Sequence, residues 1–447
     1  MKSNGPFSRR GLLRYSAAAA FLSGLPSWYL ADLRAAEEAK PTADKPKAKD
    51  DFRIGLVGCG GMGTGDAKDA QRFGKVVAVC DVDENQLGRA KKNFPDAKGY
   101  KDFRELVQQK DLDVVICATV DHWHTLVSIA AMKAGKDVYT EKPLTLCIDE
   151  GKRLVKVQKE TGRVLQTGTQ QRSDIRFRLA VDLVRNGRIG KLKHIDVWIP
   201  AGQRKGPFAK APVPAGFDWD LWQGPTPAVD YVKERAHQTF RYWWEYSGGT
   251  ITDWGAHHND IALWTTGFDR SGPVSVEGKA LNEMIPGGFT ANSEHEIHFT
   301  YPDGVTHTSR STTANSPFGA VVDPKGRQHG IAYIGTEGWL WVTRGKIDAS
   351  KPEMLKEKLP ESAPRVYVSN DHKGNFFECV KTRKAPICDV EIGHRSATMC
   401  HLGVAAVRLG RKLNWDPVKE EYVGDAEAQA TAVREMRKPY DYSFIEA

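Results

Sequence analysis

Residues 52–83 read FRIGLVGCGGMGTGDAKDAQRFGKVVAVCDVD, and this stretch decides the fold of the first part of the chain. The apolar run 54–57 predicts a buried strand, which leads into the glycine-rich turn 58–63. A helix is predicted from this turn to Phe73, and the apolar run 76–80 predicts a second strand. A GxGxxG turn is common by itself, but between a strand, a helix and a strand it indicates a dinucleotide-binding βαβ unit.

The glycines of this turn each meet a physical requirement of such a site. Gly58 permits the tight turn, Gly60 lets the backbone approach a pyrophosphate, and Gly63 lets the helix pack close to the strand. The helix N-terminus offers free N–H groups to the phosphates. Asp81, 23 residues after Gly58, ends the second strand, where a carboxylate accepts both ribose hydroxyls and repels a 2′-phosphate. The pattern favours NAD over NADP; a glycine-rich turn followed by a solvated aspartate is the structural alternative.

A βα rhythm continues beyond this unit. Residues 114–119 (VVICAT) predict a buried parallel strand, and residues 138–140 predict another that enters Glu141-Lys142-Pro143. Ligands of such sheets lie outside the carboxyl ends of the strands. We therefore expect Thr119, Glu141 and Lys142 to face a cofactor crevice.

The composition is that of a globular protein, with 447 residues, 40% hydrophobic and 27% charged. This length exceeds the usual limit of one hydrophobic core, so we expect two domains. The formal net charge is +8, but residues 1–50 contribute nine Lys or Arg and five Asp or Glu, which leaves +4 for the rest. That excess does not indicate a nucleic-acid partner.

The N-terminus is typical of an export signal. Paired arginines in residues 8–14 (SRRGLLR) precede a short apolar run, 15–25. A membrane-spanning helix needs about 20 apolar residues, so the run predicts the hydrophobic part of a signal and no stable membrane insertion. The arginine pair resembles the twin-arginine signal, which an export machinery reads on folded proteins; a ragged basic tail is the alternative.

These features predict a periplasmic or otherwise exported protein whose folded part begins near Phe52. We expect the signal peptide at residues 1–36 and a charged linker, EEAKPTADKPKAKDD, at residues 37–51. The seven cysteines contain no CxxC pair, which argues against a cysteine metal site. Cys59, Cys80 and Cys117 lie in or beside apolar runs and are expected to be small core residues.

A second chemically suggestive stretch is SGGTITDWGAHHND, residues 247–260. If residues 250–264 form a helix, Asp253 and His257 share one face, with Asp260 three positions further along. A metal site is disfavoured, because His257 and His258 point about 100° apart and no HExxH motif is present. Two interpretations stay open: a hydrogen-bonded core pair, or an acid–base pair that uses a histidine of pKa about 6.5.

From Phe52 to about Asp416 the chain resembles the Gfo/Idh/MocA oxidoreductases, named after glucose–fructose oxidoreductase, inositol dehydrogenase and rhizopine catabolism. Four motifs carry the resemblance: residues 58–63, residues 118–124 (ATVDHWH), Glu141-Lys142-Pro143, and Gly248-Gly249-x-x-x-Asp253-x-x-x-His257. Val120 stands where family members often have proline. The resemblance implies an α/β chain: a Rossmann domain (52–170) and a substrate-binding and oligomerisation domain with a large open, mostly antiparallel sheet (171–447).

The resemblance also implies the site residues. The catalytic set is Lys142, Asp253 and His257, with the lysine near the nicotinamide and the bond before Pro143 often cis. No metal is expected. The residues expected to bind NAD are Gly58, Gly60, Gly61, Met62, Gly63, Asp81, Thr119, His124, Glu141 and Lys142.

The expected reaction is hydride transfer between a hydroxyl carbon of a sugar, glycoside or cyclitol and tightly bound NAD. His257 removes the hydroxyl proton, Lys142 stabilises the alkoxide, and Asp253 holds the histidine or binds a neighbouring hydroxyl. An NAD-dependent glycosidase that works by oxidation, elimination, addition and reduction, as in α-N-acetylgalactosaminidases of this family, is the alternative. A non-catalytic sugar-binding protein is a third interpretation. Proteins with such a sheet commonly pair, so a homo-oligomer is expected.

Aromatic residues concentrate in residues 217–244. Aromatic faces pack against the apolar faces of sugars, so a carbohydrate site is one interpretation and ordinary packing is the other. Gln170, Arg172 and His237 are further candidates for polar contacts in the pocket.

Overall fold

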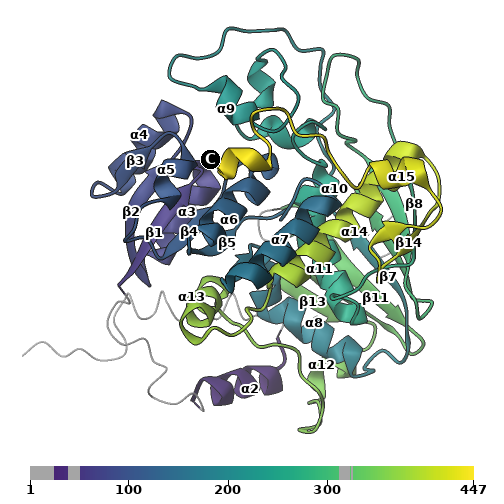
Figure 1. The fold of residues 1–447 in the computed structure, drawn as a ribbon. Helices are drawn as coiled ribbons and strands as arrows, with labels where there is room; N and C mark the ends of the chain where they lie inside the picture. The colour runs from purple at the N-terminus through teal and green to yellow at the C-terminus, as the bar shows by residue number, and fades with distance from the viewer. Residues whose placement is uncertain (1–24, 39–50, 312–322, 324–325, 447) are drawn as a thin grey trace, which may run out of the picture.

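The computed structural model describes residues 25–38, 51–311, 323 and 326–446. Two sheets organise this part of the chain (Figure 1). The predicted combination of an N-terminal Rossmann domain and an α/β domain with a large, mostly antiparallel sheet is confirmed.

The first sheet is parallel and six-stranded, with the order β3-β2-β1-β4-β5-β6. Its strands are β1 Phe52–Val57, β2 Gly74–Cys80, β3 Lys98–Tyr100, β4 Val114–Cys117, β5 Asp137–Thr140 and β6 Leu165–Thr167. The connecting helices are α3 Gly61–Ala70, α4 Glu84–Asn93, α5 Phe103–Val107, α6 His124–Lys133 and α7 Ile148–Thr161. Alternate residues enter opposite cores: Ile54 and Leu56 belong to one apolar cluster, and Val57 belongs to the other. Both faces are therefore covered, as the continuous apolar runs require.

The second sheet has nine strands in the order β13-β12-β11-β7-β10-β9-β8-β14-β15. All neighbouring pairs are antiparallel except β10 with β7. The strands are β7 Leu192–Trp198, β8 Ser275–Ala280, β9 His295–Thr300, β10 Thr306–Arg310, β11 Gly330–Gly335, β12 Trp339–Thr343, β13 Lys346–Ala349, β14 Leu413–Asp416 and β15 Glu421–Tyr422. Helices α8 Ile175–Arg185, α11 Gly255–Thr266 and α14 Val390–Leu409 share its largest apolar core.

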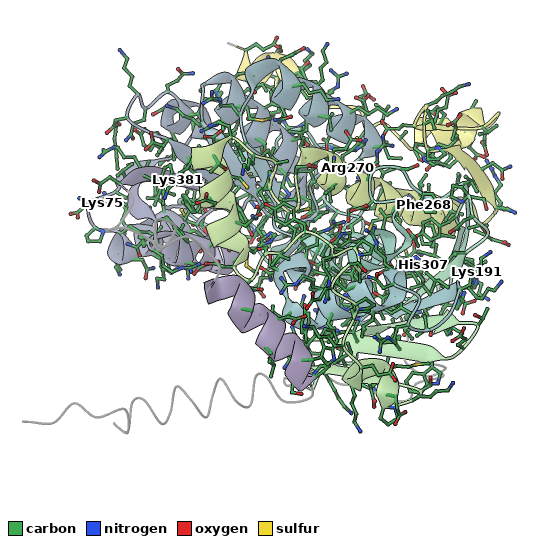
Figure 2. The ribbon with its side chains drawn as sticks, turned by 90° about the horizontal axis from the view of Figure 1, so that it is seen from below. Lys75, Lys191, Phe268, Arg270, His307 and Lys381 are labelled. Carbon is green, nitrogen blue, oxygen red and sulfur yellow. The ribbon has the colours of Figure 1, made fainter. Side chains whose placement is uncertain are left out.

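Helix α13, His372–Thr382, returns from the second part of the chain to the first sheet. The Phe377 ring lies 4.6 Å from the Phe73 ring and 5.2 Å from the Phe52 ring, measured between centroids. Figure 2 shows Lys381 of this helix near Lys75 of β2. The core of the Rossmann part thus includes a helix from far beyond residue 170.

Helix α2, Ser27–Glu38, lies within the segment expected to be signal and linker (Figures 1 and 2). Trp28 Nε1 donates to the Leu355 carbonyl oxygen (2.8 Å), and Arg178 Nε donates to the hydroxyl of Tyr29, which is 3% exposed. The folded part therefore includes residues before Phe52, because Trp28 and Tyr29 form hydrogen bonds with residues more than a hundred positions away in sequence. The arginine pair and residues 15–24 of the apolar run lie outside the described residues.

All seven cysteines are buried and free of disulfides, in agreement with the expected core location of Cys59, Cys80 and Cys117. Within the described ranges, no helix has the length and apolar character needed to cross a membrane.

Candidate active site

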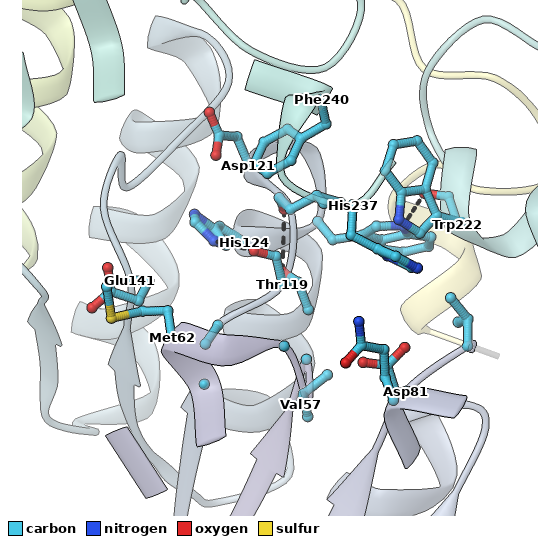
Figure 3. A pocket seen from close by; sticks show the side chains of 18 of the residues that line it. Val57, Met62, Asp81, Thr119, Asp121, His124, Glu141, Trp222, His237 and Phe240 are labelled. Carbon is cyan, nitrogen blue, oxygen red and sulfur yellow. Dashed lines mark hydrogen bonds between the residues drawn. The ribbon is translucent and has the colours of Figure 1, made fainter. Parts of the chain in front are cut away.

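A cavity of about 710 Å³ opens at the carboxyl ends of β1, β2, β4 and β5 (Figure 3). All ten residues predicted to bind NAD line it. Figure 3 shows Asp81 and Asp121 on opposite sides of this cavity, with Thr119 and His124 between them. The volume is within the usual range for small-molecule sites, about 300–1,000 Å³.

The turn between β1 and α3 fits a dinucleotide. Gly58 has φ 91°, and a Cβ there would lie 2.4 Å from the Ala118 carbonyl oxygen. A Cβ on Gly63 would lie 2.0 Å from the Gly58 carbonyl oxygen, so the helix could not approach the strand. By contrast, a Cβ on Gly60 or Gly61 would meet no atom within 4 Å. These two positions leave open space beside the free N–H groups that begin α3, where a pyrophosphate can lie.

Asp81 is fixed by the backbone of the same region. Its Oδ2 accepts from the Cys59 N–H (2.8 Å) and its Oδ1 accepts from the Asp83 N–H (2.9 Å). Burial raises the pKa of Asp81 above its ordinary value, and these two backbone donors oppose that rise. The carboxylate is therefore an ordered part of the cavity wall and not the solvated side chain of the structural alternative.

Residues 216–241 form what we call the cofactor strap, a segment that leaves the second sheet and crosses the Rossmann part. Backbone bonds attach it: the Glu84 N–H donates to the Gly216 carbonyl (2.9 Å), and the Asp218 N–H donates to the Val82 carbonyl (3.0 Å). His237 Nε2 lies 2.9 Å from Asp83 Oδ2. Residues of the strap that line the cavity are Leu221, Trp222, Ala236, His237, Gln238, Thr239, Phe240 and Arg241.

The aromatic stretch divides between packing and the cavity wall. Trp222 and Phe240 line the cavity. The remaining aromatic members of the buried cluster in this stretch, Phe217, Trp219, Tyr231 and Trp243, pack with these two residues in a separate apolar core. Most of the aromatic residues therefore build the strap, and two of them face the cavity.

Lys142 and Asp253 meet although 111 residues separate them. The ammonium group of Lys142 is ion-paired with Asp253 Oδ1 and donates to the Asp253 carbonyl oxygen (3.2 Å). Arg241 Nε lies 3.4 Å from Oδ2 of the same carboxylate. Burial raises the pKa of Asp253, but the charges of Lys142 and Arg241 outweigh it and hold the pKa below its ordinary value. The Lys142-Pro143 bond is cis.

His257 lies beside this pair, on the next helix. Residues 250–264 do not form one helix: α10 is Thr250–Asp253, and α11 begins at Gly255. The histidine is 7% exposed, and its Nδ1 has no hydrogen-bond partner in the described part of the chain. Burial lowers its pKa well below the ordinary value, and the charges of Lys142 and Arg344 lower it further. The imidazole is therefore neutral at neutral pH.

Two expectations about neighbouring residues are wrong. Asp253 does not hold His257, because its carboxylate is ion-paired with Lys142 and no hydrogen bond joins it to the imidazole in the described part of the chain. Asp260 does not continue their face; it is fully buried against Arg172 Nε (2.8 Å). His258 is also fully buried, with its Nε2 2.9 Å from His329 Nδ1.

The three candidates for polar pocket contacts lie in three different environments. His237 lines the cavity, Arg172 is occupied by its buried ion pair, and Gln170 is exposed outside the cavity lining. Across the described ranges, no group of three or more His, Cys, Asp or Glu side chains could hold a metal ion.

Sequence reasoning missed three further ionisable residues of the cavity wall: Lys101, Asp121 and Arg241. Asp121 accepts from the Ser247 hydroxyl (2.6 Å), and burial raises its pKa to about 7. Its position inside residues 118–124 was an available signal. Arg241 lies on a 3-10 helix of four residues, Thr239–Tyr242, which is too short to show a periodic pattern, so the sequence offered no signal for it.

Comparison with known proteins shows that the chain is an oxidoreductase and gives its family. Residues 52–169 match the NAD-binding Rossmann fold of an oxidoreductase family, and residues 197–442 match the C-terminal alpha/beta domain of the same family. The chain belongs to the Gfo/Idh/MocA oxidoreductase family.

The sequence identity between this chain and individual relatives is low. The chain is 28% identical to myo-inositol 2-dehydrogenase of Thermotoga maritima over 52% of its own length and 59% of that protein's length. It is 25% identical to scyllo-inositol 2-dehydrogenase (NAD(+)) of Bacillus subtilis over 83% and 98% of the two lengths. It is 33% identical to a glycosyl hydrolase family 109 protein of Saccharopolyspora erythraea over 36% and 38%. The fold is similar to that of the WlbA dehydrogenase from Bordetella pertussis, solved with NADH and UDP-GlcNAcA (TM-score 0.61, 20% identity, covering 81% of this chain and 98% of that one).

Proposed function

We propose that the protein transfers a hydride between a hydroxyl-bearing carbon of a sugar, glycoside or cyclitol and tightly bound NAD. One observation carries the proposal: Lys142, ion-paired with Asp253, lines a cavity whose other wall is the glycine turn of an NAD-binding fold. Similarity to the inositol 2-dehydrogenases supports the substrate class.

Each member of the catalytic set has a physical role in this proposal. Bound NAD supplies the hydride acceptor and donor. His257 accepts the hydroxyl proton, because its lowered pKa leaves a ring nitrogen unprotonated at neutral pH. Lys142 stabilises the negative charge that develops on the substrate oxygen. Asp253 holds the ammonium group in place and is a positioning residue for Lys142.

The cofactor strap supports tight retention of NAD. It is attached to the Rossmann part by backbone bonds at Glu84 and Asp218, and by the contact between His237 and Asp83. Release of a dinucleotide from beneath it requires several of these bonds to break together. Mass spectrometry of small molecules released from the denatured protein tests this proposal; a preparation that lacks NAD and binds added NAD weakly would contradict it.

The second candidate is an NAD-dependent glycosidase that oxidises a ring carbon, eliminates the aglycone, adds water and re-reduces the carbon. Similarity to the glycosyl hydrolase family 109 protein favours it as the alternative. Incubation with aryl glycosides separates the two reactions. Release of the aryl group without net formation of NADH supports the glycosidase, whereas net reduction of NAD supports the dehydrogenase.

We also propose export through the twin-arginine-type signal to the periplasm, and assembly into a homo-oligomer through the second sheet. The charged arginine motif and the open, mostly antiparallel sheet support these two proposals. Replacement of Arg9 and Arg10 by lysine should retain the protein in the cytoplasm. Light scattering of purified protein measures the number of subunits, and a monomer would contradict the second proposal.

A further inference from the structure

Positive charge gathers where the cavity meets the catalytic set. Lys142, Arg241 and Arg344 all act on Asp253, whose pKa they lower against the effect of burial. Lys142 and Arg344 also act on His257. Three cations therefore surround one ionised carboxylate and one neutral imidazole.

Arg344 is held in a defined position behind His257. Its guanidinium carbon lies 5.1 Å from the ring centroid of Trp254, and its Nε donates to Gln171 Oε1 (2.9 Å). Gln171 Nε2 in turn donates to the His257 carbonyl oxygen (3.1 Å). Arg344 Nη2 is buried, and within the described ranges no side chain or backbone group accepts from it. Arg344 does not line the cavity, so it acts on a ligand there through its charge and not by direct contact.

Arg241 reaches the same region from the cofactor strap. Its side chain is 30% exposed and lines the cavity. Nη1 donates to the Gln238 carbonyl oxygen (2.6 Å) and Nε lies near Asp253, which leaves Nη2 without a hydrogen bond to any described residue. The arginine therefore has one free donor edge at the cavity wall.

The other carboxyl groups nearby do not cancel this charge. Burial raises the pKa of Glu141 to about 8 and that of Asp121 to about 7, so both carry less negative charge at neutral pH than ordinary carboxyl groups do. Asp174 also acts on Arg344; its carboxyl group accepts from the Arg176 N–H (2.8 Å) at the start of α8, and burial raises its pKa. Three further neighbours are paired: Glu245 with Arg235 (3.0 Å), Asp260 with Arg172 (2.8 Å) and Asp323 with Arg327 (2.6 Å).

We propose that the substrate carries a carboxylate, as a uronic acid does, and that Arg241 binds this carboxylate while Arg344 stabilises it from behind His257. The inference rests on the proposed hydride transfer and names the substrate class. Guanidinium groups match the planar geometry of a carboxylate, and complementary charge favours the correct substrate over its neutral analogue. A neutral sugar would leave the excess positive charge of this region uncompensated.

The test compares matched pairs of sugars with the full-length protein in its NAD-bound form. Glucuronate is compared with glucose, and galacturonate with galactose. Reduction of the bound cofactor is followed by the absorbance of reduced nicotinamide, and binding by the thermal shift that each sugar causes. The carboxylated member of each pair should have a kcat/KM at least about 10-fold higher and should cause the larger thermal shift. Added salt should reduce this preference.

Variants assign the preference to the two arginines. Arg241→Gln and Arg344→Gln should each lower the ratio of kcat/KM between the carboxylated and the neutral sugar about 10-fold, whereas Arg241→Lys, which keeps the charge and loses the planar donor pair, should lower it less. Arg327→Gln is the matched control, because Arg327 also lies 5.1 Å from the Trp254 ring but is paired with Asp323. The ratio should stay unchanged in this control.

The test distinguishes failure of the substrate inference from failure of the proposed function. If neutral sugars reduce the bound NAD and uronates neither react nor shift the melting temperature, the substrate inference is overturned and hydride transfer stands. If no sugar of either kind reduces the cofactor, the proposed function fails together with the inference. An unchanged ratio in Arg241→Gln and Arg344→Gln would also overturn the assignment to these residues.

Discussion

Replacement of Asp253 by asparagine tests the ion pair at the centre of the site. The side chains of Lys142 and Asp253 are 11% and 17% exposed, so the pair is largely shielded from water. Loss of one partner of a buried pair costs about 3–5 kcal/mol. Because the Asp253 carbonyl oxygen still accepts from Lys142, we expect the lower end, about 3 kcal/mol of unfolding free energy.

The same substitution should lower turnover more than it lowers NAD content. A misplaced Lys142 no longer stabilises the charge on the substrate oxygen, and loss of one such donor typically reduces turnover by about 10²–10³. Single-turnover reduction of the bound NAD measures the effect. The matched control is Asp269→Asn, which removes the carboxylate paired with Arg172 Nη1 (2.9 Å), outside the cavity lining. This control should lose stability and keep its turnover.

The pH dependence of stability gives an independent reading of the Asp253→Asn variant. The pKa of Asp253 is lowered in the folded protein, so its ionised form contributes stability above the unfolded value of about 3.9. This contribution disappears as the pH falls through the lower, folded-state value. The difference in melting temperature between wild type and variant should be constant near neutral pH and shrink below about pH 4. Turnover within a few-fold of wild type, together with a pH-independent difference, would refute the role given to this pair.

Three further predictions follow from single positions. His257→Gln should lower turnover by about 10²–10⁴ with unchanged NAD content. The same change at the half-exposed His298 should have no effect on turnover. Equal turnover of both variants would exclude His257 as the base. Gly60→Ala should reduce NAD content with little change in the stability of the cofactor-free protein, because the added Cβ meets no protein atom within 4 Å. Gly63→Ala, whose Cβ would lie 2.0 Å from the Gly58 oxygen, should lower both the NAD content and the stability. Full NAD content in Gly60→Ala would contradict the assigned phosphate site. Tyr29→Phe should lower the unfolding free energy by about 1–3 kcal/mol, seen as a lower melting temperature, because Arg178 Nε loses its acceptor. Tyr367→Phe, at a 45% exposed tyrosine, should lower it less. An unchanged melting temperature in Tyr29→Phe would show that α2 does not dock.

Local periodicity predicted the Rossmann part well. The strand runs, the glycine turn and Asp81 are close in sequence, and each signal concerns residues that are also close in space. Helix α13 could not be assigned to the Rossmann core in this way, because its contacts with Phe52 and Phe73 span more than three hundred residues.

The catalytic region was less accessible to sequence reasoning. The spacing of Asp253 and His257 suggested a pair on one helix face, but the carboxylate of Asp253 pairs with Lys142 instead. Lys142 follows β5 of the first sheet and lies 111 residues away in sequence. Arg241 lies on a short 3-10 helix, Thr239–Tyr242, and Arg344 lies in the turn between β12 and β13, so their approach to the same carboxylate depends on how the chain folds around it.

Hydride transfer from a carbohydrate to NAD held in this cavity is tested most directly by one experiment on the purified protein. The cofactor released on denaturation is identified by mass spectrometry, and the absorbance of reduced nicotinamide is recorded after addition of each sugar in a panel to the native protein and to Lys142→Met. We expect NAD in both proteins, and its reduction by at least one sugar in the native protein only. Absence of NAD, or equal reduction in both proteins, would contradict the proposed chemistry.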